Sequence, residues 1–168
     1  MRILIFTTLF IIYSLNVPAQ TDSLNFKKNA FYLEIGGVGG HASLNYERSL
    51  WRKNQFDIIG RVGLNFYNMV DFKGDFNPDL TIPFMAGVMY GRQHKAEFGF
   101  GQTFSSTIEA DLDSGEPTRV NHFNTIFNLG YRYQKPGGGL LFRCMYTPII
   151  EYQEVFYHWF GVSIGYTF

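Results

Sequence analysis

The chain ends in Tyr157-His158-Trp159-Phe160-Gly161-Val162-Ser163-Ile164-Gly165-Tyr166-Thr167-Phe168. From Phe160 onward, every second residue is aromatic or aliphatic, and the residues between them are small or polar. A period of two residues indicates a β-strand with two unlike faces. Because chain ends usually fray into water, an apolar face that reaches Phe168 predicts an apolar environment around this strand.

Seven further segments alternate in the same way, with turn residues between them: 30–38, 41–50, 55–67, 80–90, 95–106, 119–133 and 139–148. Their lengths suit the 9–11 residues with which a tilted strand crosses a bilayer. Proline removes a hydrogen bond from a sheet, so we expect Pro83 to lie at a bulge near one rim.

The connections alternate in length, which predicts an up-and-down order of strands. Short turns follow the second, fourth and sixth segments, whereas longer loops cover 68–79, 107–118 and 149–156. The glycines of 36–40 predict a short, flexible first loop. The pattern as a whole predicts an all-β protein, an eight-stranded antiparallel up-and-down transmembrane β-barrel over residues 29–168.

The composition agrees with a membrane barrel and excludes other classes. Charged residues are 17% of the chain, compared with about 25% in average soluble domains, and aromatic residues are 18%. The formal net charge of zero gives no reason to expect nucleic acid as a partner. A single cysteine, Cys144, allows neither an intrachain disulfide nor a cysteine metal cluster.

The polar face of the strands consists mostly of Gly, Ser, Thr and Asn, and its charges have both signs. A soluble lipocalin-like barrel would instead enclose its apolar face around an apolar ligand and expose many Lys and Glu residues. We therefore predict that the polar face fills a narrow lumen. The predicted lumen charge network is Glu34, Glu47, Asp57, Arg61, Glu97, Arg132 and Arg143, with Lys95 on the same face.

Aromatic residues near the strand ends predict two girdles at the membrane interfaces. The expected members are Tyr46, Phe56, Phe66, Tyr90, Phe104, Tyr131, Tyr133, Phe160 and Phe168.

The first 19 residues have the pattern of a cleaved signal peptide. Arg2 precedes an apolar run over 3–15, and Val17 and Ala19 place small residues before a cut. The run is shorter than the roughly 20 residues of a membrane-spanning helix, which disfavours an anchor. Residues 20–28 are expected to form a short N-terminal extension.

These features together resemble the small OmpA/OmpX-type outer-membrane β-barrel family over nearly the whole mature chain. The resemblance implies a non-enzymatic protein of the cell outer membrane, structural or active through its outer loops, with no cofactor. It also implies contact with outer-membrane lipid and lipopolysaccharide, a monomeric state, and barrel-assembly machinery that reads Tyr166 and Phe168. The Ala-Gln cut before Thr, Asp and Ser looks like signal peptides of Bacteroidota.

An enzyme is the alternative within this family, because a few small barrels act on lipid A with His, Ser and an acidic residue. His41 and Ser43 match best, since they share one strand face. The Asn that the deacylase pattern expects next is Leu44, and the predicted face is the lumen rather than the lipid side. We interpret both residues as hydrogen-bonded lumen groups.

The acidic segment 109–116 resembles the start of a calcium loop, with Asp111, Asp113 and Glu116 at intervals. Its Gly115 comes one place early, and His122 stands where the twelfth-position Glu belongs. We interpret the segment as a solvated outer loop without a metal site.

Overall fold

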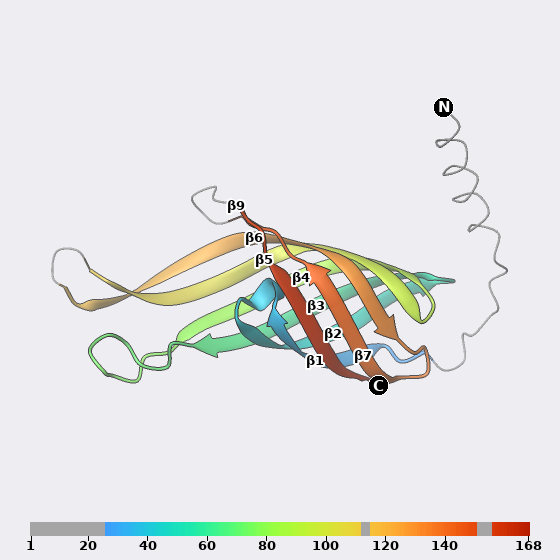
Figure 1. The fold of residues 1–168 in the computed structure, drawn as a ribbon, viewed down its shortest axis with the longest axis horizontal. Coiled ribbons are helices and arrows are strands. Elements are labelled where there is room, and N and C mark those ends of the chain that lie inside the picture. Colours follow the sequence, from blue (N-terminus) through green and yellow to red (C-terminus); the bar gives the residue numbers. More distant parts are fainter. Residues whose placement is uncertain (1–25, 112–114, 151–155) are drawn as a thin grey trace, which may run out of the picture.

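The computed structural model describes residues 26–111, 115–150 and 156–168, and their strands form one closed antiparallel sheet (Figure 1). The barrel strands are β1 (Asn29–Gly36), β2 (Ala42–Lys53), β3 (Phe56–Tyr67), β4 (Asp79–Gly91), β5 (His94–Ala110), β6 (Pro117–Gln134), β7 (Gly139–Tyr146) and β10 (Phe160–Thr167). Two short strands, β8 (Ile149–Ile150) and β9 (Phe156–Tyr157), continue the sheet beside β6, and a 3-10 turn, η1 (Gly37–Gly39), follows β1.

The barrel closes because its first and last strands pair. β1 is hydrogen-bonded to β2 on one side and to β10 on the other, with Leu33 opposite both Leu44 and Ile164. The remaining barrel strands pair with their neighbours, and β5 joins β6. The predicted eight-stranded antiparallel up-and-down barrel is therefore confirmed.

The apolar face of each strand points outward. Phe98, Phe100, Val162 and Ile164 are all exposed, and Ile164 keeps 61% of its surface accessible. The alternate residues, such as Glu97 and Ser163, are buried inside the barrel. The lipocalin-like alternative required the opposite orientation and is wrong. Within the described ranges, no helix is long and apolar enough to cross a membrane.

The two ends of the barrel differ, as Figure 1 shows. At the turn end lie the C-terminus and the short connections 54–55, 92–93 and 135–138. At the loop end lie η1, the loop 68–78 and the β5–β6 hairpin, which projects beyond the other strands (Figure 1).

Three predicted boundaries need correction. Half of the expected loop 107–118 is strand, because β5 runs to Ala110 and β6 begins at Pro117. The expected loop 149–156 contains β8 and the start of β9, and the closing strand begins at Phe160 rather than Tyr157. Residues 151–155 lie outside the described chain.

The expected bulge at Pro83 is also wrong. Pro83 pairs with Thr103 of β5, and the register of β4 with both neighbours stays constant on either side of it. The barrel accommodates the missing N–H by an interruption in the β3–β4 pairing. A bulge occurs instead in β2, where Ser49 and Trp51 flank an extra residue.

The predicted signal peptide of residues 1–19 lies outside the described chain. Of the expected N-terminal extension, residues 26–28 are described, and they continue along the turn end. The N–H of Lys27 donates to Pro136 O (3.0 Å), and Lys28 O accepts from the N–H of Ser49 (2.7 Å).

Candidate functional site: a charged interior beneath an outer surface

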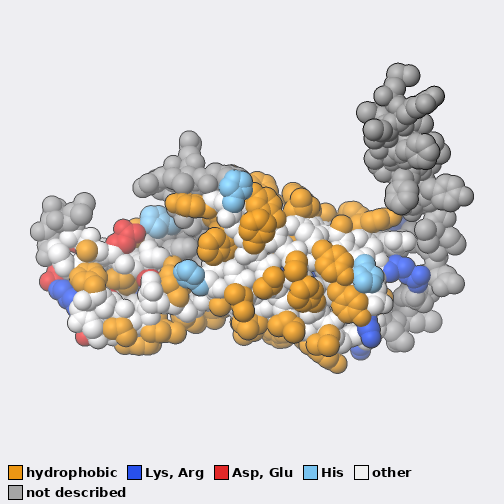
Figure 2. All heavy atoms as spheres, viewed as in Figure 1, with side chains coloured by type: hydrophobic (Ala, Val, Ile, Leu, Met, Phe, Trp, Pro, Cys, Tyr) orange, Lys and Arg blue, Asp and Glu red, His pale blue; other side chains and the backbone are white. Residues whose placement is uncertain are grey.

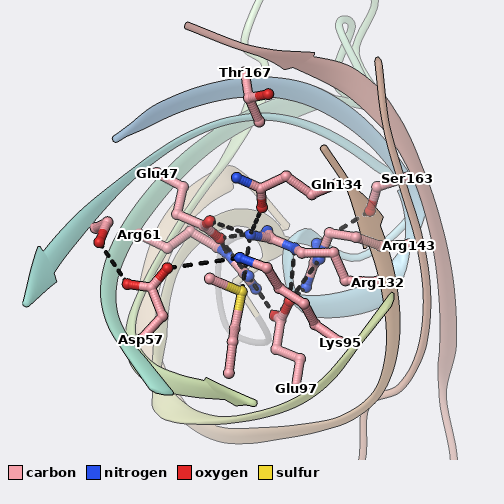
Figure 3. A network of polar contacts seen from close by, with 12 residues as sticks. Glu47, Asp57, Arg61, Lys95, Glu97, Arg132, Gln134, Arg143, Ser163 and Thr167 are labelled. Carbon is pink, nitrogen blue, oxygen red and sulfur yellow. Dashed lines mark hydrogen bonds and ion pairs between the residues drawn. The ribbon is translucent and has the colours of Figure 1, made fainter. Parts of the chain in front are cut away.

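The centre of the barrel is held by ion pairs between strands far apart in the chain (Figure 3). Glu47 of β2 accepts two hydrogen bonds from Arg132 of β6, at 2.5 and 2.7 Å. Its Oε2 also accepts from Arg61 of β3, from Nη2 at 2.7 Å and from Nε at 3.2 Å. Two-pronged guanidinium–carboxylate pairs are strong and fix the geometry of both partners.

Glu97 of β5 connects this group to the opposite wall. Its carboxylate accepts from Arg61 at 2.6 Å and from Arg143 of β7 at 2.8 and 3.2 Å. Arg143 in turn donates to Glu34 of β1 at 2.9 Å. Arg132 and Arg143 have no exposed surface. Because each buried charge faces opposite charges, the high cost of its desolvation is offset.

A second charged layer lies at the turn end. Asp57 accepts a 2.5 Å hydrogen bond from the hydroxyl of Ser49 and faces Lys95 Nζ at 3.6 Å. The ring of Phe26 lies under Arg52, with 3.7 Å from guanidinium carbon to ring centroid, and within 5.3 Å of Lys95 Nζ. Cation–π contacts of this kind attach the N-terminal segment to the barrel.

Tyr32 fills the space beneath the arginines. The guanidinium carbons of Arg143 and Arg61 lie 4.9 and 5.4 Å from the centre of its ring. Gly165 opposite has no side chain, and an added Cβ would lie 2.3 Å from Tyr32 Cβ. Small residues on the inner face therefore leave the room that large aromatic and charged side chains occupy.

The first loop folds into the barrel and forms an interior plug, defined here as residues 36–40. Val38 is buried, and its N–H donates to Glu34 Oε1 at 3.0 Å. The carbonyl of Val38 accepts from the hydroxyl of Thr103 (2.9 Å), and that of Gly39 accepts from Asn65 Nδ2 (3.0 Å). This segment was expected to be an outer loop, but its residues 37–39 are buried, and lumen side chains satisfy three of its backbone groups.

The seven residues expected in the lumen all lie inside the barrel. Six of them form one connected group: Glu34, Glu47, Arg61, Glu97, Arg132 and Arg143. Asp57 lies apart from them in the turn-end layer with Lys95. Four uncharged residues that contact the group were not part of the predicted network: Tyr32, Asn128, Gln134 and Ser163. The alternation places Tyr32, Asn128 and Ser163 on the polar face, whereas Gln134 was expected in a turn. The period-two pattern gave no indication that residues 36–40 fold into the barrel.

The structure does not unite His41 and Ser43 into a catalytic pair. His41 is exposed at the loop end, where its ring packs edge-on against Tyr67 (6.0 Å between centroids) and Trp159 (6.3 Å). Ser43 is buried, and its hydroxyl accepts a hydrogen bond from Asn45 at 2.8 Å. A nucleophile and its base would need to lie within hydrogen-bond reach of each other.

The acidic segment 109–116 lies at the tip of the β5–β6 hairpin, and residues 112–114 fall outside the described chain. Glu116 pairs with Lys73 of the neighbouring loop. Among the described residues, no group of three or more His, Cys, Asp or Glu side chains is placed to hold a metal ion.

The loop 68–78 and the β5–β6 hairpin are joined into one surface, which we call the outer platform. Arg119 of β6 donates to Asn77 Oδ1 at 2.5 Å and to Pro78 O at 3.2 Å. Asp79 Oδ1 accepts from the N–H of Ile108 at 2.7 Å. Four large apolar side chains of the loop are exposed on this platform: Met69, Val70, Phe72 and Phe76.

The loop of the platform is organised by Asp71. Its Oδ1 accepts from the N–H groups of Lys73 (2.9 Å) and Asp75 (3.1 Å). Desolvation opposes ionisation, but the backbone hydrogen bonds from Asp75, Lys73 and Gly74 and a side-chain bond from Asn77 together outweigh it and lower the pKa of Asp71. The ionised carboxylate therefore supports the folded loop.

Comparison with known proteins shows likeness in structure alone. No protein-family model matches the chain, and no curated protein matches it in sequence. The N-terminal β-barrel domain of Pseudomonas aeruginosa OprF superposes with a TM-score of 0.56 at 9% identity, over 84% of this chain and 96% of that one. Ail, the attachment invasion locus protein of Yersinia pestis, gives 0.55 at 11% identity, over 84% and 97%.

A second structure of Ail, described as an outer membrane protein in a phospholipid bilayer nanodisc, gives a TM-score of 0.49 at 10% identity, over 84% of this chain and 99% of that one. At such identities, the likeness to OprF and to crystalline Ail establishes the fold of the small outer-membrane barrels. What this chain does has to be argued from its own residues.

Proposed function

We propose that the chain is an integral outer-membrane protein that acts without catalysis, through the surface that its loop end presents outside the cell. The closed barrel with an apolar exterior carries this proposal. Lipid tolerates a sheet only when no edge is left unpaired, and the β1–β10 pairing removes the edge. Figure 2 shows hydrophobic side chains gathered over the barrel wall.

Aromatic clusters at both ends of the barrel support a membrane-spanning position. At the turn end, the ring of Phe31 lies 5.2 Å from that of Tyr46 and 6.0 Å from that of Phe168. At the loop end, Tyr146 lies 5.2 Å from Phe160. Rings with a polar edge favour the two interfaces of a bilayer, so these clusters mark the height of the apolar band.

The interior supports a structural or interaction role rather than a wide pore. Acidic and basic side chains are buried together inside the barrel wall, and the plug lies above them: Glu34, Glu47, Asp57, Glu97, Arg61, Lys95, Arg132 and Arg143. Function is then expected at the outer platform, where exposed apolar side chains stand on an ordered loop. Outer-membrane lipid and lipopolysaccharide would surround the wall of a monomeric barrel.

Labelling of intact cells tests the location and the orientation together. In a Cys144→Ser background, Phe76→Cys places a thiol on the outer platform, and Lys135→Cys places one in a turn at the other end. A membrane-impermeant maleimide should label the first in whole cells and the second only after lysis. Equal labelling, or recovery of the protein without detergent, would refute the proposal.

The same cells supply a test of folding. A closed barrel keeps its compact form in unheated gel samples and shifts mobility on boiling. The heat-modifiable species should fractionate with the outer membrane in each cysteine variant.

A further inference from the structure

A cavity of about 310 Å³ lies at the loop end, directly above the interior plug. Val38 and Gly39 of the plug form part of its lining, together with Ile126 of β6 and Ile149 of β8. Val38 and Ile126 belong to one buried apolar cluster, against which Ile149 packs, so this part of the lining is apolar. The volume is at the lower end of the range for small-molecule sites, which run from about 300 to 1,000 Å³.

Aromatic rings line a second part of the cavity. His41, Tyr67 and Trp159 come from three separate segments of the chain, and their rings meet edge to face at 6.0 and 6.3 Å. Trp159 Nε1 is buried and has no hydrogen-bond partner among the described residues. An indole N–H is a donor only, and a buried donor normally has an acceptor.

Neutral polar groups line a third part. Thr81 of β4, Ser105 of β5 and Asn124 of β6 come from adjacent strands, and their hydroxyl and amide groups both donate and accept hydrogen bonds. Among the described residues that line the cavity, none is Asp, Glu, Lys or Arg. The described lining therefore offers a charged ligand no carboxylate, ammonium or guanidinium partner, and the imidazole of His41 is its one basic group.

We infer that this cavity binds one uncharged pyranose ring, such as a terminal neutral sugar unit of a surface glycan. The C–H face of a pyranose packs against aromatic rings, and its hydroxyl groups match a wall that donates and accepts. A hydrocarbon tail would give the Ser105 and Asn124 groups no ligand partner, and a phosphate or sulfate would find no Lys or Arg among the described lining residues. Only the source of the sugar depends on the proposed outer-membrane location.

The chain offers an optical probe of this site, because Trp51 and Trp159 are its two tryptophans. Trp51 lies in β2 near the turn end and packs edge-on against Phe56, so Trp51→Phe leaves Trp159 as the sole tryptophan emitter. The full chain is refolded in an amine-oxide detergent, since detergents with sugar head groups would compete. Methyl β-D-glucopyranoside, methyl β-D-galactopyranoside and methyl α-D-mannopyranoside are then titrated in turn.

At least one methyl pyranoside should produce a saturable change in Trp159 emission, with a Kd on the order of 1 mM for a ligand of this size. Asn124→Leu should weaken binding about tenfold, because the hydrogen bonds between this half-buried amide and the sugar are lost. Ser105→Ala is the second variant, and heat-modifiable mobility confirms that each barrel is folded. Phe72→Ser on the outer platform is the matched control and should leave the Kd unchanged.

The inference is overturned if all three pyranosides fail to give saturable binding to folded protein. It is also overturned if Asn124→Leu and Ser105→Ala bind as tightly as the parent, or if only sulfated or acidic sugars bind. Displacement of the methyl glycoside by purified lipopolysaccharide assigns the sugar to the same membrane, and displacement by soluble mannan assigns it to glycans outside. Sugar binding measured in detergent does not depend on where the protein lies in the cell. The binding test and the cell-labelling test can therefore fail independently of each other.

Discussion

Arg132 and Glu47, which are 85 residues apart in the chain, meet inside the barrel through two hydrogen bonds of 2.5 and 2.7 Å. Glu47→Gln removes the charge that faces both Arg132 and Arg61 and leaves an excess positive charge in a buried site. We expect the free energy of unfolding to fall by about 3–5 kcal/mol, because an unpaired buried charge is costly. Denaturant titration in lipid vesicles measures it.

A double variant separates charge balance from packing. Glu47→Gln with Arg132→Met removes one charge of each sign and should lose less stability than the sum of the two single variants. The exposed pair of Lys73 and Glu116 is the control, and Glu116→Gln should change stability by about 1 kcal/mol or less. Additive losses at Glu47 and Arg132 would show that the two side chains are not coupled.

The interior plug depends on a glycine at its start. Gly36 has φ +71°, and a Cβ there would lie 2.2 Å from the carbonyl oxygen of Phe160. Gly40 has a similar φ of +82°, but its Cβ would meet nothing within 4 Å. Both alanine variants carry the strain of a positive φ. Gly36→Ala should therefore unfold at lower denaturant than Gly40→Ala, and equal midpoints would contradict the packed position of the plug.

The orientation of the barrel predicts how a charge on the outer wall behaves. Ile164 pairs with Leu33 and Phe142 in the middle of the apolar band. Ile164→Arg should destabilise the protein in lipid vesicles by about 2–4 kcal/mol, the range for arginine near a bilayer midplane. His94→Arg, at the turn end, should change the unfolding free energy by about 1 kcal/mol or less. Similar small losses at both positions would place Ile164 in water.

Substitution of the last residue, Phe168, should affect assembly in cells more than the stability of the folded barrel. Phe168 exchanges two backbone hydrogen bonds with Asn29 (2.9 and 3.1 Å), and its ring stacks on Phe31. Phe168→Ser keeps the backbone bonds and loses a ring contact of about 1 kcal/mol. If assembly machinery reads this residue, the folded protein in cells should fall strongly, while refolding in detergent stays efficient. Phe160→Ser, at the other end of β10, serves as the control and should assemble normally.

The outer platform should respond to acid through Asp71. Its pKa in the folded loop is lowered below the ordinary 3.8, so the loop is fully stabilised above that pH. The stabilisation is lost as the pH falls through the lowered pKa and the carboxylate takes up a proton. The amide NMR shifts of Lys73 and Asp75 should follow this titration. In the Asp71→Asn variant, the amide shifts of Lys73 and Asp75 should no longer change with pH over this range. Shifts that do not change with pH in the parent protein would contradict the two hydrogen bonds.

Alternation identified the barrel because it is a local property of each strand. The alternation within β5 is enough to assign each side chain to a face, with Glu97 and Gly99 on one face and Phe98 and Phe100 on the other. The same pattern places oppositely charged residues on one inner surface, although it does not say which of them pair. Arg132 lies closer in the sequence to Arg143 than to its main partner Glu47, so the pairing follows only from the order of the strands around the barrel.

The features that the sequence did not reveal depend on long-range contacts. Gly37 and Val38 looked like part of an open turn, because the side chains that hold the plug, Asn65 and Thr103, belong to distant strands. The segment 107–110 continues the alternation of β5, but its place beside the acidic residues of 109–116 led to its interpretation as a loop. Pro83 resembled a bulge, yet the neighbouring strands tolerate its missing donor without a change of register.

The bulge in β2 allows the length of this strand to change by one residue at Leu50. Ser49 pairs with Ile59 and Trp51 with Ile58, so Leu50 has no counterpart in β3. Shortening the strand by this residue would bring Trp51 directly after Ser49 and keep every residue pair between β2 and β3, with the tight connection at 54–55 intact. We therefore expect related sequences to differ in length at Leu50 first. A change of one residue at the bulge keeps the inward-facing side chains of β2 inside the barrel and the outward-facing ones outside.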